Sequence, residues 1–350
     1  MKHLVTDWLH PEILQLSAYH VPHPGQAIKL NTMENPYRWE EALLEQWLKL
    51  LPEVQFNRYP DSSAHLLKQQ LREVMQIPPN REGMLGNGSD ELIQMLVLAL
   101  RGTLLIPEPS FVMYRHLAQV AKMPCVGVPL TKDFQLDSPA MLEAIDVHQP
   151  ALIFLACPNN PTGTLFKDVE AIIERAPGIV VIDEAYAPFT DYSFMSRLNE
   201  YDHVLVMRTV SKWGLAGLRL GFLVGPSEWI NQLEKVRQPY NINTLTQLTA
   251  RFALQHYALF KEQTHRIRMD RQHVFQQLYA LPNVQVWPSE ANFLLFKVSH
   301  AEHIFHQLKE RNILIKCVHG RHPLLEDCLQ VTIGTPQENE TFIHHLAQLL

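Results

Sequence analysis

The sequence predicts an α/β protein whose larger part is a mainly parallel sheet covered by helices, followed by a smaller α+β unit. Two observations support this prediction. Between residues 103 and 224, six short apolar runs rich in β-branched residues alternate with helical segments or Pro/Gly loops. Continuous apolar strands separated by helices are typical of parallel sheets buried on both faces. After residue 282, three more strand-like runs surround one helix.

The elements follow from the spacing of apolar residues and from the turn residues between them. Helices are expected at 39–51, 64–75 and 92–100, the last after a glycine-rich turn, and one or two more at 247–263 and 265–279. The large sheet takes its strands from residues 103–107, 125–130, 151–157, 179–183, 204–207 and 220–224. The smaller unit has strands at 293–298, 313–316 and 329–333 and a helix at 301–311.

These elements divide the chain into three parts. Prolines and a glycine interrupt residues 1–37, which we expect to form an N-terminal arm. Residues 38–245 form the predicted large domain, and residues 246–350 form the small domain, with part of the N-terminal segment packing on it.

Composition excludes several classes of function. The 350 residues carry a formal charge of -6, so no basic surplus is available to neutralise nucleic-acid phosphates. The apolar runs are far shorter than the ~20 residues that span a bilayer, and residues 1–10 contain no apolar run of the signal-peptide type. Four cysteines without CxxC spacing predict neither a metal site nor a disulfide framework. We therefore expect a cytoplasmic protein with small-molecule partners, no metal, no membrane and no nucleic acid.

Three central strands of the large sheet end in polar residues. Asn160 follows the first, Asp183 ends the second with Tyr186 just beyond it, and Lys212 follows the third. The intervals of 23 and 29 residues between Asn160, Asp183 and Lys212 are long enough for helical crossovers. Because right-handed crossovers return each strand in the same direction, all three tips are expected at one edge of the sheet.

An amide, a carboxylate, a phenol and an amine at one edge meet the needs of pyridoxal 5'-phosphate. The Lys212 amine would form a Schiff base with its aldehyde and later move a proton. Buried Asp183 would hold the proton on the pyridine nitrogen, which makes the ring an electron sink. Asn160 and Tyr186 would donate to the 3-hydroxyl oxygen. The predicted catalytic residues are Lys212, Asp183 and Tyr186.

The phosphate and the ring of this cofactor need partners as well. Backbone N–H groups of the glycine-rich turn, where a helix begins, are suited to bind an anion. The Ser211 hydroxyl and the Arg219 guanidinium can add hydrogen bonds to it. Phe111 is the nearest aromatic residue that could stack on the ring. The residues predicted for these tasks are Gly88, Ser89, Asp90, Phe111, Thr209, Ser211 and Arg219.

Each of these motifs alone has a plainer explanation. Asn159-Asn160-Pro161-Thr162-Gly163 can be an ordinary turn, and Asp183-Glu184 can cap a helix or bind a metal. Phe111 alone is more often a core residue, and a single lysine such as Lys212 is usually solvated. Their order along one chain indicates the cofactor site.

With these motifs the chain resembles the fold-type I pyridoxal-phosphate enzymes of the class I/II aminotransferase group over nearly its whole length. Within that group it is most similar to the histidinol-phosphate aminotransferases. The features nearest to that branch are Leu16-Ser17-Ala18-Tyr19, Leu30-Asn31-Thr32-Met33-Glu34-Asn35-Pro36-Tyr37 and Asn57-Arg58-Tyr59-Pro60. The motifs shared across the group are Gly88-Ser89-Asp90-Glu91, Cys157-Pro158-Asn159-Asn160-Pro161-Thr162-Gly163, Leu215-Ala216-Gly217-Leu218-Arg219 and Val331-Thr332-Ile333-Gly334-Thr335.

The resemblance implies a homodimer that passes an amino group between glutamate and imidazole acetol phosphate, a step of histidine biosynthesis. It also implies that Tyr59 reaches the cofactor phosphate of the other subunit and that Tyr19 closes over the substrate imidazole.

Two features depart from the pattern of these relatives. Lys212 and Arg219 are seven residues apart, where eight is usual in much of the group. The second departure is Gln330, which stands where the family usually has an arginine that binds the substrate carboxylate and phosphate. A neutral amide cannot replace a bidentate guanidinium without loss. Our hypothesis is that Lys316 and Arg321 supply the positive charge that the missing arginine would have provided. The predicted substrate-binding residues are Tyr19, Lys316 and Gln330.

Gln330 also keeps related activities open, namely an aromatic amino-acid aminotransferase or a decarboxylase of a phosphorylated amino acid. A nucleotide-binding protein that uses residues 86–91 as its phosphate turn is the alternative from another class, and it predicts no covalent cofactor.

Overall fold

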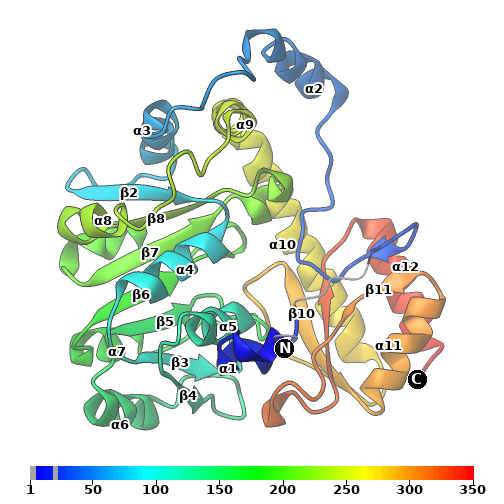
Figure 1. Ribbon diagram of the computed structural model, residues 1–350. Helices are drawn as coiled ribbons and strands as arrows, with labels where there is room; N and C mark the ends of the chain where they lie inside the picture. Colours follow the sequence, from blue (N-terminus) through cyan, green and yellow to red (C-terminus); the bar gives the residue numbers. More distant parts are fainter. Residues whose placement is uncertain (1–4, 19–22) are drawn as a thin grey trace.

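The computed structural model, described for residues 5–18 and 23–350, has the predicted α/β architecture (Figure 1). A seven-stranded sheet has the order β2-β8-β7-β6-β5-β3-β4, in which only β8 runs antiparallel to its neighbours. Its strands are β2 (Arg81–Gly86), β3 (Leu104–Glu108), β4 (Cys125–Pro129), β5 (Leu152–Ala156), β6 (Ile179–Asp183), β7 (Val204–Thr209) and β8 (Gly221–Pro226).

Helices cover both faces of this sheet because its strands are apolar on both sides. In β5, Leu152 and Phe154 belong to one hydrophobic cluster, whereas Ile153 and Leu155 belong to another. Successive side chains of a strand point to opposite faces, so the two clusters lie on opposite faces of the sheet. The first contains residues of α4 (Ser89–Ala99), α5 (Val112–Val120) and α8 (Ser227–Leu233); the second contains residues of α3 (His65–Val74), α6 (Ser138–His148), α7 (Val169–Arg175) and α9 (Thr244–Gln255).

The C-terminal part has its own sheet and its own core. Four antiparallel strands have the order β12-β13-β10-β9. They are β9 (Val284–Val286), β10 (Phe293–Val298), β12 (Lys316–Cys317) and β13 (Cys328–Thr332), and they pack with α10 (Tyr257–Ala280), α11 (Ala301–Glu310) and α12 (Pro336–Ala347).

The N-terminal segment joins this smaller unit. Strand β1 (Ile28–Lys29) pairs in parallel with β11 (Ile313–Leu314), and Leu30 and Met33 lie in the same hydrophobic cluster as β10 and β13. Farther along, α2 (Glu41–Leu48) extends away from both sheets, whereas α1 (Pro11–Leu14) contacts α5 (Figure 1). The predicted boundaries at 37/38 and 245/246 stay predictions.

Two predicted elements differ in the structure. The break between the long helices lies at His256 and not near residue 264, because Thr264 is buried inside the continuous helix α10. The predicted strand 313–316 is divided between β11 and β12, which pair with different partners, β1 and β13. A local apolar pattern cannot show this change of partner.

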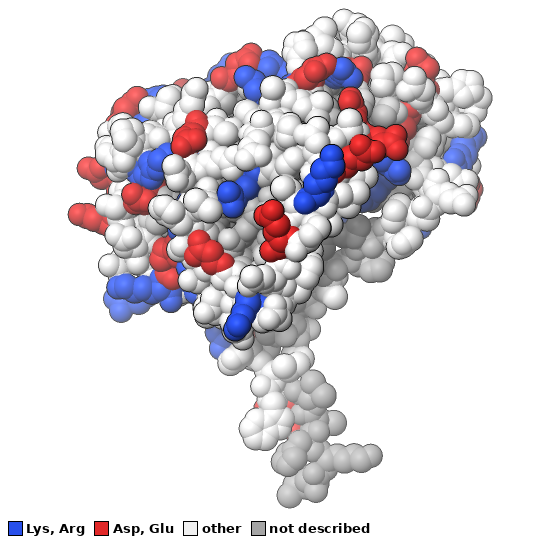
Figure 2. Space-filling model, turned by 90° about the horizontal axis from the view of Figure 1, so that it is seen from above, with Lys and Arg blue, Asp and Glu red and all other residues white. Residues whose placement is uncertain are grey.

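Charged side chains of both signs are interspersed on the face drawn in Figure 2, with uncharged surface between them. Within residues 5–18 and 23–350, no helix combines the length and the apolar character that crossing a membrane requires. Cys125, Cys157, Cys317 and Cys328 are all free thiols.

Candidate active site

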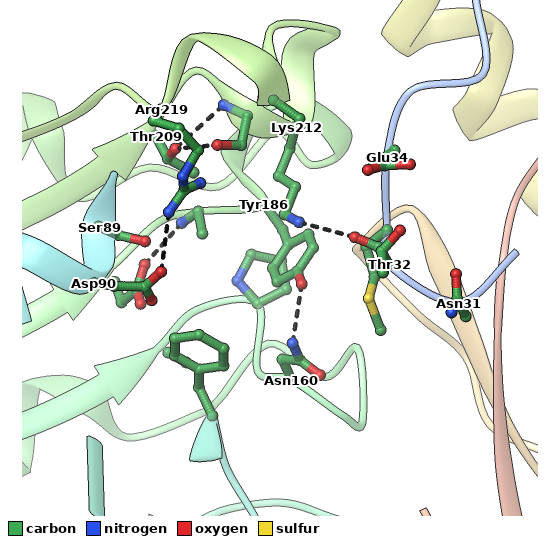
Figure 3. A pocket seen from close by; sticks show the side chains of 18 of the residues that line it. Asn31, Thr32, Glu34, Ser89, Asp90, Asn160, Tyr186, Thr209, Lys212 and Arg219 are labelled. Carbon is green, nitrogen blue, oxygen red and sulfur yellow. Dashed lines mark hydrogen bonds and ion pairs between the residues drawn. The ribbon is translucent and has the colours of Figure 1, made fainter. Parts of the chain in front are cut away.

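A cavity of about 400 Å³ lies at the carboxyl ends of β5, β6 and β7. Ala156 pairs with Asp183 and Asp183 with Met207, so the three strand ends lie side by side. Residues 31–34 form the opposite wall (Figure 3). Of the residues singled out in the sequence, the cavity is lined by Ser89, Asp90, Phe111, Asn160, Asp183, Tyr186, Thr209, Ser211, Lys212, Arg219 and Lys316.

Lys212 lies in the short 3-10 helix η5 (Ser211–Trp213), directly after β7. Its ammonium donates a hydrogen bond to the Thr32 carbonyl at 3.3 Å (Figure 3). Burial lowers the pKa of Lys212 to about 8, against the opposing effect of the carboxylates Glu34 and Asp90. A fraction of this lysine is therefore uncharged near neutral pH, which is the form that attacks a carbonyl carbon.

Asp183 ends β6 and is buried. Its carboxylate accepts hydrogen bonds from the Tyr114 hydroxyl at 2.6 Å and from the Ala185 backbone N–H at 3.0 Å. Burial raises the pKa of Asp183 to about 6, although both hydrogen bonds act in the opposite direction. A buried carboxylate with a raised pKa is well suited to share a proton with a ring nitrogen.

Tyr114 is a residue of the site that the sequence did not reveal. It lies on the apolar face of α5, fully buried, where a tyrosine cannot be told from a core residue by spacing. Burial and the neighbouring Asp183 raise its pKa, so the phenol stays protonated as a donor. The one signal available was that a buried phenol needs a hydrogen-bond partner.

Asn160 and Tyr186 form a hydrogen-bonded pair at the cavity. Asn160 Nδ2 donates to the Tyr186 hydroxyl oxygen at 3.0 Å (Figure 3). On its other side, Asn160 Oδ1 accepts a hydrogen bond at 3.1 Å from Gln330 of β13. The amide and the phenol predicted to act on one oxygen thus lie together.

Hydrogen bonds of the Asn159 side chain stabilise the turn that carries Asn160. From the sequence, Asn159 was predicted only as part of that turn. Asn159 is fully buried, and its Nδ2 donates to the Pro109 carbonyl and the Thr162 hydroxyl, each at 3.0 Å. Its Oδ1 accepts from the Ser110 hydroxyl at 2.8 Å. These bonds connect the turn to the loop that precedes Phe111.

The turn where β2 passes into α4 could hold an anion. Ser89 and Asp90 begin α4, where backbone N–H groups have no acceptor within the helix. Arg219 donates to the Asp90 carboxylate at 3.1 Å, so seven residues after Lys212 suffice to bring the guanidinium to the cavity. Gly88 has φ +82°, and a Cβ there would lie 2.5 Å from Arg219 Nη2. A side chain at this position would displace the guanidinium.

A second cavity of about 420 Å³ adjoins the first and shares Phe111, Asn160 and Lys316 with it. Arg321 and His322 line its far side. Burial, followed by the positive charges of Arg321 and Lys212, lowers the pKa of Lys316 to about 8.

Two of the predicted residues, Gln330 and Tyr59, do not line the cavity. Gln330 is fully buried and lines neither cavity. Tyr59 is 80% exposed and stacks on Tyr240, with ring centres 4.4 Å apart, so within one chain it does not reach the cavity. Tyr19 lies outside the described residues.

Comparison with known proteins places the chain in a family. The model of the family "Aminotransferase class I and II" matches residues 26–346. Histidinol-phosphate aminotransferase 2 of Nitrosococcus oceani is 51% identical, covering 99% of this chain and 98% of that protein. Histidinol-phosphate aminotransferase of Chromobacterium violaceum is 47% identical, covering 98% of each.

Among solved structures, histidinol-phosphate aminotransferase of Sinorhizobium meliloti in complex with pyridoxal-5'-phosphate superposes with a TM-score of 0.85. The match covers 98% of this chain and 97% of that one at 22% identity, which demonstrates a shared fold. From the family match and the close relatives together, the chain belongs to the class I and II aminotransferases.

Proposed function

We propose that this chain is a pyridoxal 5'-phosphate-dependent transaminase that converts L-histidinol phosphate and 2-oxoglutarate into imidazole acetol phosphate and L-glutamate, in histidine biosynthesis. The observation that supports it most is the meeting of Lys212, Asp183 and the Asn160–Tyr186 pair around one cavity. The relatives that share 47–51% of its residues bear the corresponding name.

The residues of the cavity fit this cofactor. Asp183 is a buried carboxylate ready to hold a proton, and Lys212 is an amine whose pKa is lowered to about 8. The turn at Gly88 leaves no room for a side chain beside Arg219, which suits the close approach of a phosphate to the backbone. When bound, the cofactor supplies an aldehyde and an electron-withdrawing ring.

The chain's own groups then have separable tasks. Asp183 holds a proton at the ring nitrogen, and Tyr114 keeps that carboxylate in place. Asn160 and Tyr186 act on the 3-hydroxyl oxygen, Phe111 packs against the ring, and the Ser89 and Asp90 backbone with Thr209, Ser211 and Arg219 bind the phosphate. Lys212 Nζ takes a proton from the substrate carbon that carries the amine and delivers it to the cofactor carbon that began as the aldehyde.

Lys316 and Arg321 form the proposed site for the second negative charge of the substrate. Both line the adjoining cavity, and Lys316 also lines the first. The charged groups that lower the pKa of Lys316 are both cations, so an anion placed there would relieve their repulsion. A phosphate monoester and the distal carboxylate of glutamate are both such anions.

We further propose a cytoplasmic homodimer. The four free thiols suit a reducing compartment. Tyr59, which is 80% exposed in the single chain, would act on the cofactor phosphate of the partner subunit.

Two measurements test the proposed function. Borohydride reduction of the cofactor-loaded protein followed by peptide mass mapping is expected to label Lys212; an unmodified Lys212 in loaded protein would overturn the cofactor assignment. Steady-state kinetics with 2-oxoglutarate should give a higher kcat/KM for histidinol phosphate than for phenylalanine. The reverse order would instead indicate an aromatic amino-acid aminotransferase, and release of CO2 from a phosphorylated amino acid would indicate a decarboxylase.

A further inference from the structure

Gln330 lies in β13 at the contact between the small sheet and the turn that carries Asn160. Its side chain is fully buried, and its Nε2 donates to the Pro161 carbonyl at 3.3 Å and to Asn160 Oδ1 at 3.1 Å. Among the described residues its Oε1 has no hydrogen-bond partner. Burying an unpaired oxygen costs free energy, and the two hydrogen bonds made by the nitrogen offset part of that cost.

These contacts determine which way two amides face. A proline carbonyl can only accept, so Gln330 must turn its nitrogen towards Pro161. The same nitrogen faces Asn160, which must therefore present its oxygen. The nitrogen of Asn160 is left to face the Tyr186 hydroxyl, to which it donates at 3.0 Å.

We infer that Gln330 is a positioning residue that fixes the orientation of the Asn160 amide and, through it, makes the Tyr186 oxygen an acceptor whose own hydrogen points away from Asn160. This inference rests on the proposed function, in which Asn160 and Tyr186 act on the 3-hydroxyl oxygen of the cofactor.

The neutral charge of Gln330 is part of the inference. Strands β12 and β13 place Gln330 opposite Lys316, and neighbouring cations already lower the pKa of Lys316. An arginine at position 330 would donate to Pro161 equally well, but it would add a positive charge beside Lys316. Glutamine orients Asn160 without that repulsion.

The experiment measures the pH at which the visible absorption band of the full-length, cofactor-loaded protein has completed half of its change. This pH is called the midpoint below. The group that titrates is the nitrogen that joins Lys212 to the cofactor. Donors that stabilise negative charge on the 3-hydroxyl oxygen favour loss of the proton from this nitrogen, so weaker donors raise the midpoint. Gln330→Met, which removes the donor at similar volume, is expected to raise it by about half a pH unit, the shift that corresponds to the loss of one neutral hydrogen bond. Asn160→Ala should also raise it.

The decisive comparison is the double variant. If Gln330 acts through Asn160, then adding Gln330→Met to Asn160→Ala leaves the midpoint where Asn160→Ala alone puts it. Additive shifts would overturn the inference, because Gln330 would then act by another route.

A control separates positioning from packing. Asn339 is a buried amide of α12 that bonds to the Gly334 backbone, away from the cavities. Asn339→Leu should lower the melting temperature and leave the midpoint unchanged. Gln330→Leu is the second variant should Gln330→Met fold poorly. An unshifted midpoint in a folded Gln330 variant overturns this inference alone, whereas a wild-type protein that binds no cofactor overturns the proposed function with it.

Discussion

Two lysines face the same cavity from opposite sheets, and they differ in their neighbours. Lys212 follows β7 of the large sheet, and Lys316 begins β12 of the small sheet. Burial lowers the pKa of each to about 8. At Lys212 the carboxylates of Glu34, Asp90 and Asp183 oppose that decrease, with Glu34 the largest contributor, while Arg219 adds to it. At Lys316 the charged neighbours that contribute are Arg321 and Lys212, and both add to the decrease.

This difference distinguishes a reactive amine from an anion site. The charge of Lys212 is balanced within the chain, so its amine can lose and regain a proton without help from a ligand. The charge of Lys316 lacks such balance in the described part of the chain, and a substrate anion would provide it. Three of the predictions below test this contrast, and one tests the buried carboxylate of the same cavity; they are given in order of decreasing effect.

Removal of the reactive amine should have the largest effect. Lys212→Ala is expected to lower kcat by at least about 10³-fold, because it removes the group proposed to move the proton at the substrate carbon. Single-turnover absorbance measurements check this. Equal losses of kcat in Lys212→Ala and Lys316→Met would contradict the assignment of Lys212 as the reactive amine and Lys316 as the anion site.

Asp183→Asn should stabilise the cofactor-free protein at pH 8. The folded pKa of Asp183, about 6, lies above the ordinary value of 3.8, so its contribution to stability is fully present below pH 4 and is lost as the pH rises through 6. Removing the ionised carboxylate should therefore raise the free energy of unfolding by about 1–3 kcal/mol at pH 8, and by less at pH 5. Urea denaturation at both pH values measures this. A destabilised variant at pH 8 would contradict it.

Lys316→Met should weaken binding of substrates with a second negative charge. The KM for histidinol phosphate is expected to rise about tenfold or more, the cost of one charge-assisted hydrogen bond, with a smaller change in kcat. Lys297→Met is the matched control, because Lys297 is an exposed lysine of β10 in the same sheet. Unchanged KM values for both histidinol phosphate and glutamate would rule out the anion site.

Arg321→Met should have the smallest effect: a smaller rise in the KM for histidinol phosphate than Lys316→Met causes, together with a shift of the pH profile. Lys316 is charged below its pKa of about 8 and loses its charge above it, so kcat/KM for histidinol phosphate should fall above pH 8. Without Arg321, the pKa of Lys316 rises and this fall moves to higher pH, by less than about one unit. Profiles with phenylalanine, which carries no second anion, should not move.

The two sides of the cavity also differ in how far the sequence could predict them. On the large sheet, crossover lengths place Asn160, Asp183 and Lys212 at one edge, and the strand register brings them to one cavity. On the small sheet, the position of Gln330 was predicted but not its contact with Asn160. That contact joins residues 170 positions apart and depends on how the two sheets pack.

Tyr114 shows the same limit within a single helix. Its spacing in α5 is that of a core residue, and only the tertiary structure shows that its hydroxyl reaches Asp183. Local patterns report which face of an element is buried, but not which polar atom a buried group meets.

The wall opposite Lys212 has a consequence for the order in which the protein can be completed during synthesis. Met33 donates its backbone N–H to the Thr332 hydroxyl, and its carbonyl accepts from Asn292. The segment that supplies the Thr32 carbonyl to Lys212 is therefore anchored by residues that are synthesised 259 and 299 positions after Met33. β13 must leave the ribosome before this wall can be fixed, so the large sheet can form before the site is complete.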